Sequence, residues 1–505
     1  MEPGYETLTL KSPDGTVSVQ TGVECKLPAS AEEIARVLSL SARAVPMTAE
    51  ASEKEAKISG RVLFFVLYTD REGNLKKCEC GVECGCGVKD DRITPQSDLY
   101  LSVRAENARF RMQGGTVYLT AVMTAEVRLS TPKTVQAISS LSGAVEKTEE
   151  VQYVVASEGM RSSATVGDSW EENLCLADVL CYDVGVEKSA VSAGVGSVAV
   201  EGTICVAMLV KASGGGISIA VHTFPFAVAL EDNDCMPGFT ADISVAVGTV
   251  HFDVLADPDK NTSKIDLSAE LLLTGALYKE AEVTLLADAF SETDLLAITR
   301  ENCRFEKAPE IRTEVLRLSA KAPLSQAVAA DAKVLAALPV GTYPAGTTAE
   351  NGRITTESVL TCAVYYAEEG TVKALTCDLP FTAETTAETE ALASAETDFY
   401  IERFSADFAG ETELAVSAIA KANFTLRYQG EISVFTNAEE CGERKTRPGA
   451  IAIRFPKEGD DLWTLSSSLG VKPERVMECN PDLRFPLTGE ERVLLYTKKV
   501  TDYTE

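Results

Sequence analysis

Four closely spaced cysteines are the residues of this sequence whose type and spacing best suit metal chemistry. They form two Cys-x-Cys pairs, Cys78 with Cys80 and Cys84 with Cys86. Four thiolates can close a tetrahedral zinc site, and oxidation can cross-link them. In an extended strand, however, all four thiols share one face, and the outer two lie about 26 Å apart at ~3.3 Å rise per residue. A metal site therefore needs a hairpin at 81–83, and without one we expect small apolar core residues and no bound cofactor.

The other residues of interest stand in two short segments near the C-terminus. They are Gly459, Asp460, Asp461, Leu462 and Trp463 in the first segment, and Asn480 and Pro481 in the second. The pattern predicts a strand, a tight turn capped by Asp460, and a helix with Leu462, Leu465 and Leu469 on its inner face. A second short helix is expected from about Pro473 to Asn480, followed by a strand at 493–496. We therefore expect a compact β-α-α-β unit.

The remaining residues give no pattern that favours catalysis. The two histidines, His222 and His251, stand in strand-like contexts, and a Cys–His nucleophilic pair with Cys205 or Cys235 lacks a third group to orient it. The sequence also lacks G-x-S-x-G, H-E-x-x-H and a Gly-rich phosphate loop followed by Lys. We therefore expect a protein that is not an enzyme.

Composition and charge restrict the class of partner. The chain has 505 residues, 47 of them Lys or Arg and 76 Asp or Glu, for a net charge of −29. A surface this acidic repels phosphate backbones, which argues against nucleic acid and against anionic membranes as partners. An apolar fraction of 45% and a charged fraction of 24% are typical of a folded chain.

The first residues carry no export pattern. Residues 1–15 have no basic region followed by an apolar one, and no apolar run reaches the roughly 18–20 residues that span a bilayer. We therefore expect no signal peptide, cytoplasmic synthesis, no membrane insertion, and thiols that are mostly reduced.

A pattern of apolar segments recurs three times along the chain. The string A-x-V-L occurs at 35–38, 177–180 and 332–335, and about 22 residues later each copy reaches an apolar run, at 61–68, 203–210 and 359–366. Each copy closes on a stretch that alternates apolar and polar residues, beginning at Val117, Ile265 and Leu414. Alternation with a period of two over this length predicts a strand with one buried face.

The sequence thus predicts a mainly β protein with four domains. Three are tandem β-rich, sandwich-like repeats at 1–150, 151–300 and 301–440, and the fourth is the small βααβ unit at 450–497. The joins at 134–145 and 291–300 predict short linking helices, because each combines apolar residues three or four apart with a polar start. Ser30 with Glu33 predicts another short helix before the first A-x-V-L strand.

These motifs resemble two known families. The string G-D-x-L-W, the following L-x-x-x-L-G and the later N-P are similar to a LysM domain. The apolar runs, the Pro-Phe segments at Pro225-Phe226 and Pro380-Phe381, and Asp288-Ala289-Phe290-Ser291 resemble the SPOCS domains of clostridial spore-coat proteins. Three SPOCS-like repeats followed by one LysM-like domain are similar to the SipL-like clostridial spore-coat morphogenetic proteins.

The resemblance implies a function and a set of binding residues. It implies a non-enzymatic scaffold of the spore envelope, made in the mother cell and located at the forespore surface or in the spore coat. Its LysM-like groove, formed by Gly459, Asp460, Asp461, Leu462, Trp463, Asn480 and Pro481, would bind a coat partner protein, the spore morphogenetic ATPase. The alternative is a protein that binds cell-wall glycan, peptidoglycan with its N-acetylglucosamine, although Asp461 adds a negative charge where family members usually have Thr.

Overall fold

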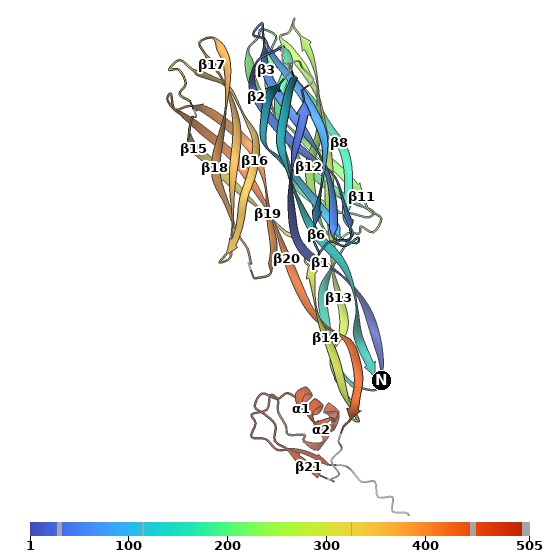
Figure 1. The fold of residues 1–505 in the computed structure, drawn as a ribbon. Coiled ribbons are helices and arrows are strands. Elements are labelled where there is room, and N and C mark those ends of the chain that lie inside the picture. The colour runs from blue at the N-terminus through green and yellow to red at the C-terminus, as the bar shows by residue number, and fades with distance from the viewer. Residues whose placement is uncertain (28–32, 114–115, 325, 389, 445–450, 497–505) are drawn as a thin grey trace, which may run out of the picture.

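The computed structural model describes residues 1–27, 33–113, 116–324, 326–388, 390–444 and 451–496, and this part of the chain is mainly β. Figure 1 shows long strands that run from a wide end of the molecule into a narrow stalk, with a small helical unit at the end of the stalk. The mainly β class expected from the alternating apolar pattern is therefore confirmed.

Apart from β21 and β22 near the C-terminus, the strands of the described residues fall into three sets that follow one another in the chain. Set 1 contains β1 (Glu2–Lys26), β2 (Ile34–Ser52), β3 (Glu55–Asp70), β4 (Leu75–Lys89), β5 (Asp98–Gln113) and β6 (Thr116–Ser142). Set 2 contains β7 (Val145–Ala156), β8 (Met160–Glu172), β9 (Leu176–Ala193), β10 (Ser197–Ala212), β11 (Ile217–Glu231), β12 (Thr240–Asp257) and β13 (Thr262–Phe290). Set 3 contains β14 (Asp294–Glu306), β15 (Glu310–Pro323), β16 (Lys333–Glu350), β17 (Arg353–Glu368), β18 (Thr371–Thr386), β19 (Leu392–Phe408) and β20 (Glu413–Glu443). The predicted ranges 1–150, 151–300 and 301–440 each cover most of one set.

The same pairing pattern recurs in each set. One sheet has the order β2-β3-β4, β9-β10-β11 or β16-β17-β18, and its middle strand contains the apolar run of that repeat. The other sheet is built on the long strand β6, β13 or β20, which pairs with β5, β12 or β19 on one side. On its other side β6 pairs with β1 alone, whereas β13 pairs with β8 and β7, and β20 with β15 and β14. The single strand β1 thus takes the place of two strands in the other sets.

Within each set the two sheets face each other across an apolar core. In set 1, Val117, Leu119 and Met123 from β6 pack with Val62 and Phe64 from β3, and all are fully buried. These are the positions of one parity in the alternating sequence, so every second residue of a strand enters the core.

The second halves of the long strands leave the sandwiches and pack together as a stalk. Its core combines residues from all three sets, because Leu8 and Val135 of set 1, Leu285 of set 2, and Phe305 and Val434 of set 3 lie in one cluster. A second cluster nearer the tip joins Ile138, Leu141, Leu286, Ala289 and Phe435. Each arm of the stalk therefore buries apolar residues against arms of the other sets.

A buried charged cluster lies where the strands enter the stalk. Glu306 of β14 accepts hydrogen bonds from Arg128 Nη1 at 2.9 Å, from Ser130 Oγ at 2.9 Å and from Tyr278 Oη at 3.2 Å. Beside it, Arg427 of β20 forms an ion pair with Asp242 of β12, with 2.7 Å between Nη2 and Oδ2. Because all three sets supply members, this cluster fixes how the sets sit against one another.

The linking helices expected at 134–145 and 291–300 are wrong. Residues up to Ser142 continue β6, and β14 begins at Asp294. Ser291 does accept the backbone N–H groups of Thr293 and Asp294, at 3.2 and 3.1 Å, but this forms the turn between β13 and β14 rather than a helix cap. The helix start expected from Ser30 lies outside the described residues, and Ile34 already belongs to β2.

The C-terminal segment has the order expected of it. It consists of β21 (Ile451–Arg454), α1 (Leu462–Leu469), α2 (Pro473–Cys479) and β22 (Val493–Tyr496), with the two strands antiparallel. Its own core is small and contains Leu465, Val476, Leu487 and Val493, all nearly inaccessible to solvent. The ends of the expected range 450–497, residues 450 and 497, lie outside the described residues.

Candidate functional site

The turn before α1 is held by two adjacent carboxylates. Asp460 Oδ2 accepts the backbone N–H of Lys457 at 2.8 Å, and Asp461 Oδ1 accepts that of Thr464 at 2.7 Å. Asp461 is therefore the N-cap of α1, because its side chain reaches a free N–H group of the first turn, while Asp460, predicted to cap the tight turn, accepts the Lys457 N–H within that turn. The hydrogen bond with Thr464 lowers the pKa of the Asp461 carboxyl and keeps it charged.

Asn480 closes the other side of the segment. Its side-chain amide donates to the carbonyls of Val476 and Leu494, at 2.9 and 2.7 Å, and its Oδ1 accepts the Leu494 N–H at 2.8 Å. These bonds attach the end of α2 to β22, and they use both the NH₂ group and the oxygen of the buried Asn480 amide. Asn480 thus positions the loop that follows it, while the neighbouring Pro481 is exposed.

The turn at 459–461 is in direct contact with the loop that follows Asn480. Gly459 N–H donates to the carbonyl of Leu487 at 2.8 Å, and Leu487 N–H donates to the carbonyl of Asp460 at 2.9 Å. Gly459 has φ of +89°, a conformation in which glycine is favoured, and this directs its N–H toward Leu487. The structure therefore brings the turn at 459–461 together with the loop after Asn480.

Trp463 faces the stalk. Its indole N–H donates to Asp288 Oδ2 of β13 at 2.8 Å, and its ring meets that of Phe290 edge-on at 5.3 Å between centroids. Leu462, its neighbour, packs instead on the small core of the segment. Trp463, one of the residues predicted to form the groove, thus attaches the C-terminal segment to the stalk. The sequence did not predict this contact.

The β21–β22 sheet carries an exposed apolar surface, which we call the apolar strip. Ile451 lies opposite Tyr496 and Ile453 opposite Leu494 in the strand register, so these four side chains share one face. Ile451 is 68% exposed and Ile453 56%, and the next residue of the same parity, Phe455, is 66% exposed. The strip consists of Ile451, Ile453, Phe455, Leu494 and Tyr496. The alternating sequence at 451–455 was the signal that could have revealed it.

The four clustered cysteines lie along β4 as an extended row. β4 pairs with β3 without interruption from Leu75 to Lys89, and the hairpin at 81–83 that a metal site would need is not formed. Cys78, Cys80, Cys84 and Cys86 pack against the core of set 1, and burial raises the pKa of the Cys80, Cys84 and Cys86 thiols. Across the described residues, no group of three or more His, Cys, Asp or Glu side chains is arranged to hold a metal ion.

The histidine of β11 has a partner other than cysteine. His222 Nε2 lies 2.7 Å from Asp168 Oδ2, and its ring stacks on Trp170 at 3.8 Å between centroids. Cys235 is fully buried and donates its thiol to the carbonyl of Ser197. The Cys–His pair considered from the sequence has no counterpart in these contacts.

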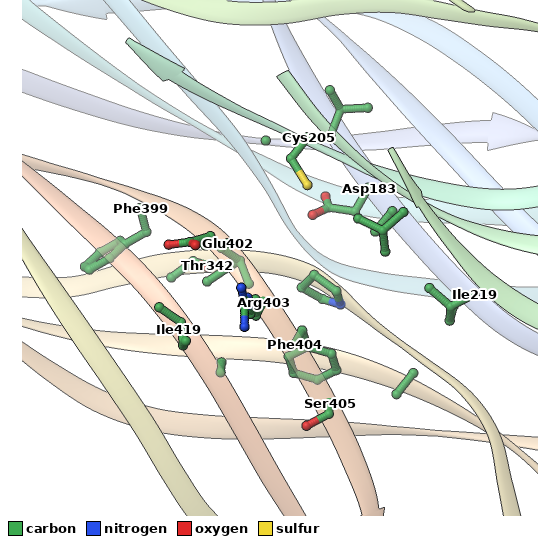
Figure 2. Close-up of a pocket in the computed structure, with 18 of the residues that line it drawn as sticks. Asp183, Cys205, Ile219, Thr342, Phe399, Glu402, Arg403, Phe404, Ser405 and Ile419 are labelled. Carbon is green, nitrogen blue, oxygen red and sulfur yellow. The ribbon is translucent and has the colours of Figure 1, made fainter. Parts of the chain in front are cut away.

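A cavity of about 740 Å³ lies between sets 2 and 3. Figure 2 shows Asp183 and Cys205 on one side of it and Phe399, Glu402 and Arg403 on the other. Burial raises the pKa of Asp183 to about 6, with Arg43 acting in the opposite direction. The cavity thus holds a carboxyl whose pKa is raised toward neutral pH.

Searches with family models, with curated proteins and with solved structures found no match to this chain. Among the described residues, neither α1 nor α2 is long and apolar enough to cross a membrane.

Proposed function

We propose that this chain is a SipL-like, non-enzymatic scaffold of the clostridial spore envelope, with three tandem SPOCS-type domains and a LysM-like C-terminal domain. Its C-terminal domain binds a coat partner protein, the spore morphogenetic ATPase. The protein is made in the mother cell and acts at the forespore surface or in the coat. The order of sequence motifs supports this proposal, and so does the recurrence of one strand-pairing pattern in three successive sets.

The observation that carries the proposal is the apolar strip on β21 and β22. Exposed apolar residues gathered on one face are typical of protein-binding surfaces, and burying such residues is the main source of binding free energy there. The strip lies on the segment that Trp463 attaches to the stalk, away from the acidic sandwiches at the wide end. A partner can therefore dock on the strip without meeting the three sandwiches.

The strip also favours a protein partner over a glycan. Aliphatic side chains such as Ile451, Ile453 and Leu494 offer a glycan no hydrogen bonds, whereas they complement an apolar protein surface. The two carboxylates of the 459–461 turn are engaged with backbone N–H groups of their own segment, at Lys457 and Thr464.

The test measures binding of the purified spore morphogenetic ATPase to the full chain and to a chain ending at residue 444. We expect the shortened chain to lose binding, and the Ile453→Asp, Leu494→Asp double variant to bind at least tenfold more weakly. The matched control is Leu255→Asp, which places the same charge on an apolar residue of β12 that is 62% exposed. Binding by the shortened chain equal to that of the full chain would contradict the proposal.

The alternative function is tested with the same proteins. Sedimentation with insoluble peptidoglycan should leave the full chain in solution. If instead the full chain sediments and the chain ending at 444 does not, the C-terminal segment is a glycan-binding module and the scaffold proposal fails.

A further inference from the structure

Two cysteines of set 1 meet at an open seam between its sheets. β1 is an edge strand of the sheet β1-β6-β5, and β4 is an edge strand of the facing sheet β2-β3-β4. Cys25 of β1 and Cys80 of β4 lie there with their Sγ atoms 3.1 Å apart. Both thiols are partly accessible to solvent.

Set 2 has a polar pair at the same place. Phe64 is the fourth residue of the first apolar run, and Cys80 lies opposite it. Val206 is the fourth residue of the second run, and His222 lies opposite it, so Cys80 and His222 occupy equivalent positions. Likewise Cys25 lies opposite Leu119 of β6, and Asp168 opposite Leu267 of β13.

The corresponding pair in set 2 is therefore His222 with Asp168, which are 2.7 Å apart. A paired interaction thus joins the two edge strands of the seam in both sets. In set 1 that pair consists of two thiols, which are able to form a covalent bond.

We propose that Cys25 and Cys80 form a disulfide that joins β1 to β4 when the protein meets a low-molecular-weight disulfide such as oxidised glutathione. The Cys25 thiolate attacks one sulfur of the small disulfide, which forms a mixed disulfide and releases one glutathione thiolate. Cys80 then attacks Cys25 Sγ and releases the second glutathione. The two protein thiols lose two electrons and two protons overall, and the small disulfide is reduced to two thiols.

The contacts of the neighbouring cysteines select this pair. The Cys84 thiol donates to Met123 Sδ at 3.3 Å, so it lies against a thioether that cannot form a disulfide. Cys78 and Cys80 are two residues apart on one strand face, a spacing of about 6.6 Å that keeps their thiols apart. The Sγ atoms of Cys25 and Cys80 need to approach by only about 1 Å to reach the S–S bond length of about 2.05 Å.

The bond closes a loop of about 55 residues that contains β2 and β3, so it restricts the unfolded chain and holds the seam of set 1 closed. The polar pair of set 2 is non-covalent. Oxidation would therefore act on this seam in set 1 and leave the corresponding pair of set 2 unchanged.

The experiment treats reduced full-length protein with oxidised glutathione, alkylates the remaining thiols under denaturing conditions, and maps the peptides by mass spectrometry. We expect two of the 14 thiols to become resistant to alkylation and a linked peptide pair that contains Cys25 and Cys80. The variant Cys84→Ser, which removes a neighbouring thiol of the same strand face, should still give this pair. In the Cys25→Ser variant, Cys80 should either stay a free thiol and become alkylated or form a mixed disulfide with glutathione, and it should not be linked to another cysteine.

A second measurement separates the crosslink from a change in folding. Hydrogen exchange of the oxidised protein should show slower opening of β1 and β4 than in the reduced protein, and no such difference in the Cys25→Ser variant. Recovery of Cys25 and Cys80 in unlinked form, or a link from Cys80 to any cysteine other than Cys25, would overturn the proposal.

Discussion

Trp463 of α1 donates its indole N–H to the carboxylate of Asp288 at 2.8 Å, across 175 positions of sequence. The same ring lies edge-on against Phe290, which is 2% exposed and is the last residue of β13. An indole N–H that is shielded from water needs an acceptor, and Trp463 is half-buried; an aromatic pair adds about 0.5–1.5 kcal/mol beyond the area it buries. These two contacts attach the C-terminal segment to the arm of set 2.

We expect Asp288→Ala to loosen this attachment, because the indole N–H then loses its acceptor. The readout is fluorescence in a Trp170→Phe background, where Trp463 is the single tryptophan of the chain. Its emission should shift to longer wavelength, and quenching by acrylamide should increase about twofold or more.

Asp253→Ala is the matched control, since Asp253 is an exposed aspartate of β12 that is far from Trp463 in the pairing pattern. Unchanged emission and quenching in Asp288→Ala would mean that the hydrogen bond does not hold the segment in solution.

The first halves of the long strands were predictable from sequence, and the second halves were not. Between Val117 and Leu129 every second residue is buried, so a period of two is visible in the sequence. Farther along, the register of β6 against β1 shifts at Ser139, because Gly4 lies opposite Ser140 and Tyr5 opposite Ile138. This bulge interrupts the alternation, so the buried residues Val135, Ile138 and Leu141 are three apart, which is the spacing expected of a helix.

The contacts of Trp463 with set 2 could not be predicted from the sequence either. The sequence predicts Trp463 as a residue of the groove, but its partners Asp288 and Phe290 lie on a strand of set 2. The helix order of the C-terminal segment depends on local turn and capping residues such as Gly459 and Pro473, which the sequence displays directly. Contacts between distant segments have no local signal of this kind.

The buried cluster around Glu306 should be sensitive to loss of one member. Glu306 is 2% exposed and lies 2.9 Å from Arg128 Nη1, so Glu306→Ala removes the buried countercharge of this guanidinium and leaves the half-exposed Glu396, 3.7 Å from its Nε, as the remaining carboxylate. We expect a loss of about 3–5 kcal/mol in the free energy of unfolding measured by urea denaturation.

The control for this variant lies on the same strand. Glu301 of β14 forms an ion pair with Lys133 at 2.6 Å, but both side chains are more than 40% exposed. Glu301→Ala should therefore change the free energy of unfolding by less than about 1 kcal/mol. Equal effects of the two variants would show that the Glu306 cluster does not stabilise the assembly of the three sets.

Asp183 should make stability depend on pH near neutrality. Its pKa in the folded chain is about 6, above the ordinary value of 3.8, so the folded state binds the proton more tightly than the unfolded state does. The penalty for ionising this half-buried carboxyl is therefore absent below about pH 4, grows as the pH rises to 6, and is fully present above 6.

Asp183→Asn removes that penalty, so we expect it to raise the free energy of unfolding at pH 7.5 by about 1–3 kcal/mol and to have little effect at pH 4. Asp378→Asn is the control, because Asp378 is exposed at the rim of a neighbouring cavity that Asp183 also lines. A gain of the same size at both pH values would contradict the assignment.

The N-cap of α1 gives a prediction within the C-terminal segment itself. Asp461→Ala removes the acceptor for the Thr464 N–H and should destabilise the first turn of α1 by about 1 kcal/mol, which speeds hydrogen exchange of its amides roughly fivefold. Asp482→Ala is the control, because Asp482 is an exposed aspartate of the same segment outside both helices.

The pKa of Asp461 gives this prediction a pH dependence. Because its hydrogen bond with Thr464 lowers that pKa, the stabilisation is fully present above the ordinary aspartate range and is lost as the pH falls through the lowered value. The difference in exchange between wild type and Asp461→Ala, corrected for intrinsic rates, should therefore be constant from pH 5 to 7 and shrink as the medium becomes strongly acidic. A difference that persists after Asp461 is protonated would show that the carboxylate is not the source of the cap's stability.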